Sequence, residues 1–255
     1  MLEQLLALDI YHLGMVFARI SGAFLALPGF AASYVQVRIR LFIAIGVSIA
    51  ILPLVIDQIP PPPGAAGGLV RLIAYEITVG VFVGVLAQML ITALHFAGTV
   101  AGLTSGLANA FVFDPVSESQ GALITGFLNL VALVLIFVTG IHMVMLEAVA
   151  ETFSLFPPGG VIPTGDMADY LAHALSRSFA IGLRLASPFI VFSIVFQTAM
   201  GVTARLMPQM NVFFVGLPAQ ILLGLSLLML VLPTIMLWFM THYEDSLRGL
   251  FAPVG

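Results

Sequence analysis

Solid apolar runs, without an alternation of apolar and polar positions, dominate this chain. Stretches with no formal charge cover residues 41–56, 77–113, 119–146, 185–204 and 206–243. A membrane-spanning strand would show alternation, whereas a membrane-spanning helix needs about 20 mostly apolar residues. The pattern therefore predicts six helical segments, at roughly 5–27, 39–56, 69–96, 121–149, 173–204 and 211–240.

Proline and glycine mark the connections between these segments. Residues 60–64 and 156–160 are rich in both, and Asp114-Pro115 interrupts the middle of the chain. The runs 77–113 and 206–243 are too long for a single crossing. We expect the first to bend or to include a re-entrant piece, and the second to be broken by its prolines, which are Pro208, Pro218 and Pro233.

Composition places the chain among membrane proteins. Hydrophobic residues make up 61% and charged residues 8%, against about 25% charged in an ordinary soluble domain. Lipid or equally apolar partner subunits must therefore cover the surface. The net charge is −4 and no basic cluster is present, which argues against nucleic acid as a partner. Cysteine is absent, so disulfides and thiolate metal sites are excluded, and we expect neither a metal nor a cofactor.

Glycines recur at four-residue spacing in the third segment. Gly80 and Gly84 form one pair, and Gly98, Gly102 and Gly106 form a longer series. Residues four apart share a helix face, and glycine lets another backbone approach closely. The spacing predicts a tight seam, either between helices of the chain or between subunits.

Four charges within apolar segments are candidates for buried groups. Glu147 and Glu151 share one helix face, and Arg177 and Arg184 stack two turns apart on another. A charge in hydrocarbon costs at least about 2.5–3.5 kcal/mol, so these groups should pair or face water. One interpretation is a proton or ion pathway; the other places them at segment ends, in the interface or in pairs.

The stretch leading to Asp114-Pro115 is unusually apolar for a connection. Non-helical backbone at membrane depth is tolerated only inside protein or along a water-filled path. Two phenylalanines among small residues would suit a plug that closes a pore by excluding water, although a plain helix end followed by a loop would also explain the pattern. The candidate plug comprises Gly106, Leu107, Ala108, Asn109, Ala110, Phe111, Val112, Phe113, Asp114 and Pro115.

Enzymatic and transport functions are weaker interpretations. The sequence has no P-loop and no H-E-x-x-H or G-x-S-x-G motif. Ser105 and His142 could be combined into an intramembrane hydrolase dyad only on slender grounds. The leading alternative is a multipass secondary transporter of a small solute or ion, which would predict paired broken helices and an internal repeat. No convincing repeat is present.

Several motifs, in order along almost the whole chain, resemble one family. They are Arg19-Ile20-Ser21-Gly22 before Leu27-Pro28-Gly29, the glycine series before Phe113-Asp114-Pro115, Gly140-Ile141-His142, Ala186-Ser187-Pro188, the turn Arg205-Leu206-Met207-Pro208-Gln209-Met210-Asn211-Val212-Phe213, and Gly216-Leu217-Pro218. Together they resemble FliR, the membrane component of the flagellar type III export gate, whose virulence-system counterparts belong to the same family.

The resemblance implies an all-α membrane protein of kinked helical hairpins, with a single export-gate domain over 1–255. Residues 1–170 would be a FliP-like part that carries the plug loop, and 171–255 a FliQ-like hairpin. Arg205, Pro208, Gln209 and Asn211 would form the turn of that hairpin, possibly at the cytoplasmic entrance. The implied protein is not an enzyme.

The implied setting is the inner membrane, in the flagellar basal body. The protein would assemble there with FliP and FliQ into the channel for unfolded flagellar substrates, and FlhB would dock on the gate. Partner subunits would then cover much of the apolar surface, so the six segments need not all cross the bilayer.

Overall fold

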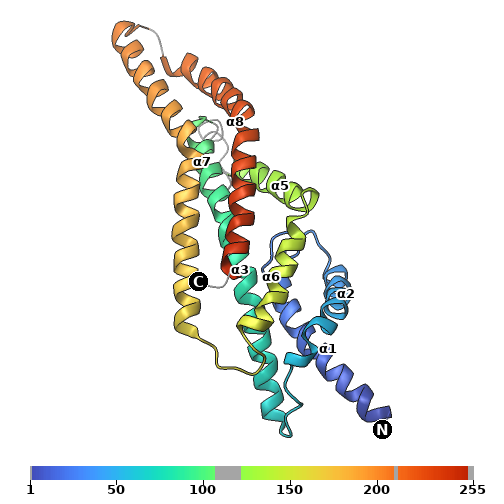
Figure 1. Ribbon diagram of the computed structural model, residues 1–255. Coiled ribbons are helices and arrows are strands. Elements are labelled where there is room, and N and C mark those ends of the chain that lie inside the picture. The colour runs from blue at the N-terminus through green and yellow to red at the C-terminus, as the bar shows by residue number, and fades with distance from the viewer. Residues whose placement is uncertain (1, 107–121, 210–211, 252–255) are drawn as a thin grey trace. The chain divides into compact units, whose positions relative to one another are not determined.

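The computed structural model describes residues 2–106, 122–209 and 212–251, and every regular element in these ranges is helical. In chain order they are α1 (Leu2–Phe24), α2 (Val37–Val55), the short 3-10 helix η1 (Ile56–Gln58), α3 (Ala66–Thr104), α5 (Ala122–Val138), α6 (Ile141–Leu155), α7 (Thr164–Leu206) and α8 (Val212–Phe251) (Figure 1). Each of the six predicted apolar segments overlaps one of these helices or, for 121–149, the pair α5 and α6, although α3, α7 and α8 extend beyond the predicted bounds.

Three of the helices are much longer than a bilayer requires. α3 has 39 residues, α7 has 43 and α8 has 40, which at 1.5 Å per residue corresponds to about 60 Å each. The hydrocarbon core of a bilayer is only about 30 Å thick. Four described helices are long and apolar enough to cross a membrane, and α5 with α6, which are bent by 76° at their junction, would make a fifth. The predicted all-α membrane class is therefore confirmed.

Proline does not break the last apolar run where the sequence led us to expect it. Pro208 lies in the connection before α8, but Pro218 and Pro233 both lie inside the continuous helix α8. Pro188 likewise lies inside α7. A proline removes one backbone hydrogen bond and commonly kinks a helix without ending it, and the ribbons of α7 and α8 are visibly curved (Figure 1). The expectation of breaks at Pro218 and Pro233 was wrong.

The chain divides into two compact units, each built from separate parts of the sequence. One unit comprises Met1–Leu90, Phe137–Ala174 and Glu244–Gly255, and the other comprises Ile91–Ile136 and Leu175–Tyr243. The division predicted at residue 170 concerned likeness to two other proteins, and it stays a prediction.

In the first unit, glycines bring α1 and α3 into backbone contact. A Cβ atom placed on Gly80 would lie 2.0 Å from the carbonyl oxygen of Arg19, and one on Gly84 would lie 2.6 Å from that of Ala23. A Cβ on Gly22 of α1 would similarly meet the Ile77 carbonyl oxygen at 2.6 Å. These neighbours are backbone atoms that cannot rotate away, so the close approach of the two helices requires glycine on both sides of the seam.

In the second unit, the C-terminal part of α3 is the helix on which the others pack. A Cβ on Gly98 would lie 2.7 Å from the Cα of Thr125 in α5. On another side, a Cβ on Gly182 of α7 would lie 2.9 Å from the Ala93 carbonyl oxygen. Gly98 thus allows the close approach of α5 to α3, and Gly182 allows the close approach of α7 to α3.

Candidate functional site

A buried ion pair joins α1 to α3 in the first unit. The Arg19 Nε donates a 2.6 Å hydrogen bond to the Glu76 Oε2, and both side chains are 0% exposed. Such a pair is costly to bury unless the remaining N–H groups and lone pairs are also satisfied. The guanidinium therefore needs further partners, and α6 supplies them.

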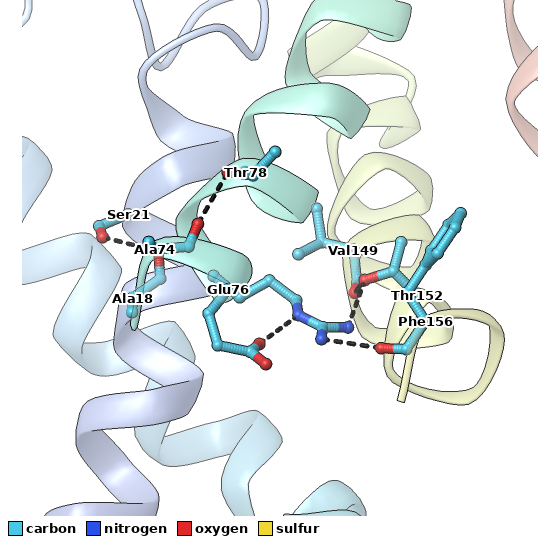
Figure 2. Close-up of polar contacts among 9 residues, drawn as sticks. Ala18, Ser21, Ala74, Glu76, Thr78, Val149, Thr152 and Phe156 are labelled. Atoms are coloured by element: carbon cyan, nitrogen blue, oxygen red, sulfur yellow. Dashed lines mark hydrogen bonds and ion pairs between the residues drawn. The ribbon is translucent and has the colours of Figure 1, made fainter. Parts of the chain in front are cut away.

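The end of α6 satisfies the other side of the guanidinium. The Arg19 Nη1 donates to the Thr152 Oγ1 at 3.2 Å, and Nη2 donates to the Phe156 carbonyl oxygen at 2.9 Å (Figure 2). The Phe153 ring lies under the guanidinium carbon, 3.9 Å from its centroid. A cation at the C-terminal end of a helix is also favoured by the helix dipole, so one side chain fastens α1, α3 and the end of α6 together.

This cluster, which we call the arginine clamp (Arg19, Glu76, Thr152, Phe153 and Phe156), is built for stability. Arg19, Glu76, Thr152 and Phe153 are 0% exposed, and Phe156, which contributes its carbonyl oxygen, is half-buried. Removing one partner of a buried, hydrogen-bonded pair typically costs about 3–5 kcal/mol. The clamp consequently holds α1, α3 and the end of α6 in a defined arrangement.

The C-terminal end of α3, in the second unit, rests on α8. The Gln220 Nε2 donates a 2.9 Å hydrogen bond to the Thr104 carbonyl oxygen. Ser105 is 0% exposed, and its Cβ lies 2.6 Å from where a Cβ on Gly224 would be. Gly106 follows with a φ of 75°, in the left-handed region that favours glycine. We call Thr104, Ser105, Gly106, Gln220 and Gly224 the α3 seat.

The candidate plug begins at this seat. Gly106, its first residue, is buried and lies two residues after Thr104, the last residue of α3. The rest of the candidate plug, Leu107 to Pro115, lies outside the described residues. The plug role stays a prediction.

Four of the five glycines singled out by their spacing lie on α3, and Gly106 lies just after it. Gly80 and Gly84 contact α1, Gly98 contacts α5, and Gly102 is buried. These contacts are between helices of the same chain. Whether any of the four also meets another subunit stays a prediction.

The four candidate buried charges are exposed on the chain taken by itself. Glu147 and Glu151 lie on α6, and Arg177 and Arg184 lie on α7. Their burial against partner subunits stays a prediction. Within the described residues, the opposite charges buried against each other are those of Arg19 and Glu76.

The described residues of the predicted turn lie at the end of α7 and in the connection that follows it. Arg205 is in the last turn of α7, and Pro208 and Gln209 form the connection that follows. All three are exposed, whereas Asn211 lies outside the described residues. A position at the cytoplasmic entrance stays a prediction.

The hydrolase hypothesis finds no support in the surroundings of its two residues. The Ser105 hydroxyl is buried and donates to the Gly102 carbonyl oxygen at 3.2 Å. The His142 ring stacks on Phe137, with the ring centroids 5.1 Å apart. Each is the packing role that an isolated serine or histidine commonly has in a membrane helix. Nor does the described part of the chain hold a group of three side chains that could bind a metal ion.

Comparison with known proteins accounts for nearly the whole chain. The model of a family described as bacterial export proteins, family 1, matches residues 10–246. The chain belongs to this family. Members with the name flagellar biosynthetic protein FliR are similar along most of their length. That of Caulobacter vibrioides is 32% identical over 94% of this chain and 96% of its own. Those of Aquifex aeolicus and Escherichia coli are both 28% identical, over 90% and 85% of this chain and 88% and 82% of their own.

The sequence pattern does not indicate two of these contacts. Arg19 belongs to the Arg19-Ile20-Ser21-Gly22 motif, but no spacing links it to Glu76. The available signal was a pair of opposite charges inside apolar segments, although each segment holds one other charge, Asp9 in residues 5–27 and Arg71 in residues 69–96. Gln220, which meets the end of α3, gave no comparable signal because a lone glutamine in a helix has many ordinary roles.

Proposed function

We propose that this chain is a subunit of the flagellar type III protein export gate, in the bacterial inner membrane at the flagellar basal body. It would form, with FliP and FliQ, the channel for unfolded flagellar substrates, and an FlhB-like subunit would dock on the assembly. The observation that carries the proposal is the family match over residues 10–246. The relatives named FliR, which are similar end to end, support the flagellar assignment.

The architecture is consistent with a part of a larger assembly. α7 exposes Phe179, Val191 and Val202, and α8 exposes Leu222 and Met229, all well beyond one-third of their surface. These side chains are distributed along helices about twice as long as the hydrocarbon core is thick. Partner subunits of similar apolar character would cover what lipid does not reach.

The channel role includes a plug formed by Gly106 to Pro115. The apolar, small and aromatic side chains of this stretch would pack against pore-lining residues with few polar groups left to satisfy. Its glycine would let the stretch move when substrate arrives. We propose no catalytic role for the chain; the energy for export would come from other components.

The proposal includes roles for three further groups of residues. Gly80, Gly84, Gly98 and Gly102 would contribute to seams between closely packed helices, including those of neighbouring subunits. Glu147, Glu151, Arg177 and Arg184 are exposed on the isolated chain, and partner subunits or the interface would satisfy them. The turn of Arg205, Pro208, Gln209 and Asn211 would lie at the entrance.

Co-expression tests the assembly directly. The tagged chain, expressed with the FliP and FliQ subunits of the same bacterium, should purify as a stable complex with both. Recovery only as a lone monomer would contradict the proposal. Uptake of a small solute by vesicles containing the purified chain alone would instead support a secondary transporter.

Deletion of residues 107–113 tests the plug. Complexes that carry this deletion and assemble normally should conduct ions in a planar bilayer much more readily than intact complexes. If the conductance stays as low as that of the intact complex, the plug assignment is wrong, although the subunit role would still stand on co-purification.

A further inference from the structure

α2 is apolar on every side, yet only one stripe of it is buried. The buried residues are Ala44, Ser48, Ile51 and Val55, which recur at three- and four-residue spacing and so lie on one face. α2 packs against α1. Only 17% of its most apolar window is buried, against 56% of that of α3. A helix that is apolar all round needs cover on all sides, so most of the surface of α2 has to be covered from outside the chain.

The exposed surface of α2 has the length and the chemistry of a lipid-facing surface. Together, α2 and η1 span 22 residues, or about 33 Å, close to the hydrocarbon core of a bilayer, which is about 30 Å thick. Apolar side chains are exposed from one end of the helix to the other, at Ile39, Leu41, Phe42, Ile43, Ile49 and Leu54. Acyl chains can therefore cover the helix along its whole length.

The two ends of this span differ in charge. Arg38 and Arg40 lie in the first turns of α2, Asp57 lies in η1 beyond the other end, and residues 41–56 between them carry no formal charge. Tyr34, which is 65% exposed, comes shortly before the arginines. Tyrosine is enriched at the level of the lipid headgroups, and a phosphate is the group there that complements arginine.

The guanidinium of Arg40 is fixed in place but only partly satisfied. Its Nη2 donates to the Ala32 carbonyl oxygen at 3.2 Å, whereas Nε is buried and has no acceptor among the described residues. Arg38 is exposed. Within the described part of the chain, the carboxylates that form ion pairs do so with Arg19 and Arg248 and not with these two arginines. Two arginines without a counter-charge, next to a lipid-facing surface, fit the oxygens of a phosphodiester.

We propose that the arginine end of α2 binds an anionic phospholipid. Arg38 and Arg40 hold its phosphate, and its acyl chains lie along the exposed face from Ile39 to Ile49, which at 1.5 Å per residue is about 15 Å, or the depth of one leaflet. The site belongs to the first unit alone and does not depend on the export assignment. It assigns lipid, and not a partner subunit, to this part of the apolar surface.

Lipid binding to the full-length chain in dodecyl maltoside tests the site. Phosphatidylglycerol is added in increasing amounts, and native mass spectrometry gives the fraction of the chain that carries it. A basic residue near an anionic membrane surface contributes about fivefold in affinity, which corresponds to about 1 kcal/mol. Arg38→Gln together with Arg40→Gln should therefore weaken binding about 30-fold. Arg38→Gln alone, which leaves the contact of Arg40 with Ala32 in place, should weaken it about fivefold.

The matched control is the double variant Arg71→Gln with Arg248→Gln. It removes two exposed positive charges from the same unit, away from the arginine end of α2, and should bind phosphatidylglycerol as the wild type does. Phosphatidylcholine, whose headgroup has no net charge, should bind more weakly than phosphatidylglycerol to the wild type. Sodium phosphate, compared with sodium chloride at the same ionic strength, should not displace the lipid.

A second experiment asks what covers α2 in the complete assembly. Bimane attached to a cysteine at Phe42 should be quenched by phosphatidylcholine spin-labelled in the middle of its acyl chain, when the chain is reconstituted with its co-purified partners in nanodiscs. Val161→Cys is the control, because Val161 is 92% exposed in the connection between α6 and α7. It should be quenched much less.

Several results would overturn the proposal. If both double variants lose lipid equally, the effect is one of net charge and no site exists at the arginine end. Displacement of the lipid by sodium phosphate would mean a site for a free anion. Equal binding of the two lipids would mean that the arginines do not select an anionic headgroup. Absence of quenching at Phe42 in the complex would mean that a partner subunit covers α2.

Discussion

Removing Glu76 should destabilise the chain through the charge that it leaves behind. Glu76→Ala deletes the carboxylate that accepts the 2.6 Å hydrogen bond from Arg19, and it leaves a guanidinium that is 0% exposed without a counter-charge. The contacts of Arg19 with Thr152 and the Phe156 carbonyl remain. Neither of these neutral groups compensates for a buried positive charge.

The expected size follows from burial. Breaking a buried ion pair by removing one partner costs about 3–5 kcal/mol. For a chain of this length, 1 kcal/mol corresponds to about 2–4 °C in Tm, which gives a decrease of about 6–20 °C. The double variant Arg19→Met with Glu76→Met removes both charges together. It should cost much less than the two single substitutions added, because no uncompensated charge remains.

The assay is thermal unfolding of the purified chain in detergent, followed by intrinsic fluorescence and by loss of helical circular dichroism. Glu244→Ala is the matched control, since Glu244 pairs with Arg248 at 3.0 Å on an exposed helix surface. Exposed pairs four residues apart contribute about 0.3–0.5 kcal/mol, so the control should lose no more than about 2 °C.

Two results would refute this reasoning. One is a Tm decrease for Glu76→Ala no larger than that for Glu244→Ala, which would mean that water reaches the clamp. The other is a double variant whose decrease equals the sum of the single ones, which would mean that Arg19 and Glu76 contribute independently.

Three further outcomes follow from the packing. Gly80→Ala should lower Tm clearly, because the new Cβ would lie 2.0 Å from a backbone oxygen and overpacking typically costs about 1–3 kcal/mol. Gly46→Ala is the control: nothing lies within 4 Å of its Cβ, so this variant should be neutral or slightly stabilising. Ser105→Ala keeps the Cβ in the seat, so motility of cells carrying it should be normal; loss of motility with normal assembly would revive a role for the hydroxyl. A cysteine introduced at Val191 in this cysteine-free chain should react with a maleimide in the isolated chain and be protected in the complete complex, and equal labelling would place that surface away from any partner.

The helices were predictable because the apolar runs are long and their interruptions are chemically distinct. Residues 60–64 and 156–160 end their segments as proline and glycine commonly do. The prolines inside α8 were misjudged because residue identity alone does not tell whether a helix kinks or ends. A helix can continue past a proline that removes one backbone hydrogen bond, and α8 does so at Pro218 and Pro233.

The sites were harder to predict, because they depend on contacts between distant residues. Arg19 and Glu76 are 57 positions apart, and Gln220 and Thr104 are 116 apart. No periodicity connects such pairs. Glycine spacing was more informative: Gly80, Gly84 and Gly98 all lie where another backbone comes close, since that is the structural use of a residue without a side chain.

The helices of this chain differ in how well their lengths match the thickness of a bilayer. α2 with η1 spans 22 residues, or about 33 Å, which matches a bilayer, whereas α7 and α8 are about twice that length. Tilting alone cannot place 43 residues within about 30 Å, because the helix would have to lie about 60° from the membrane normal, beyond the usual range. Apolar side chains are nevertheless exposed from Phe179 to Leu206 along α7. The stretch from Phe179 to Leu206 is about 40 Å long, more than the hydrocarbon core is thick. Partner subunits of the proposed export assembly would cover the part of this surface that lipid does not reach.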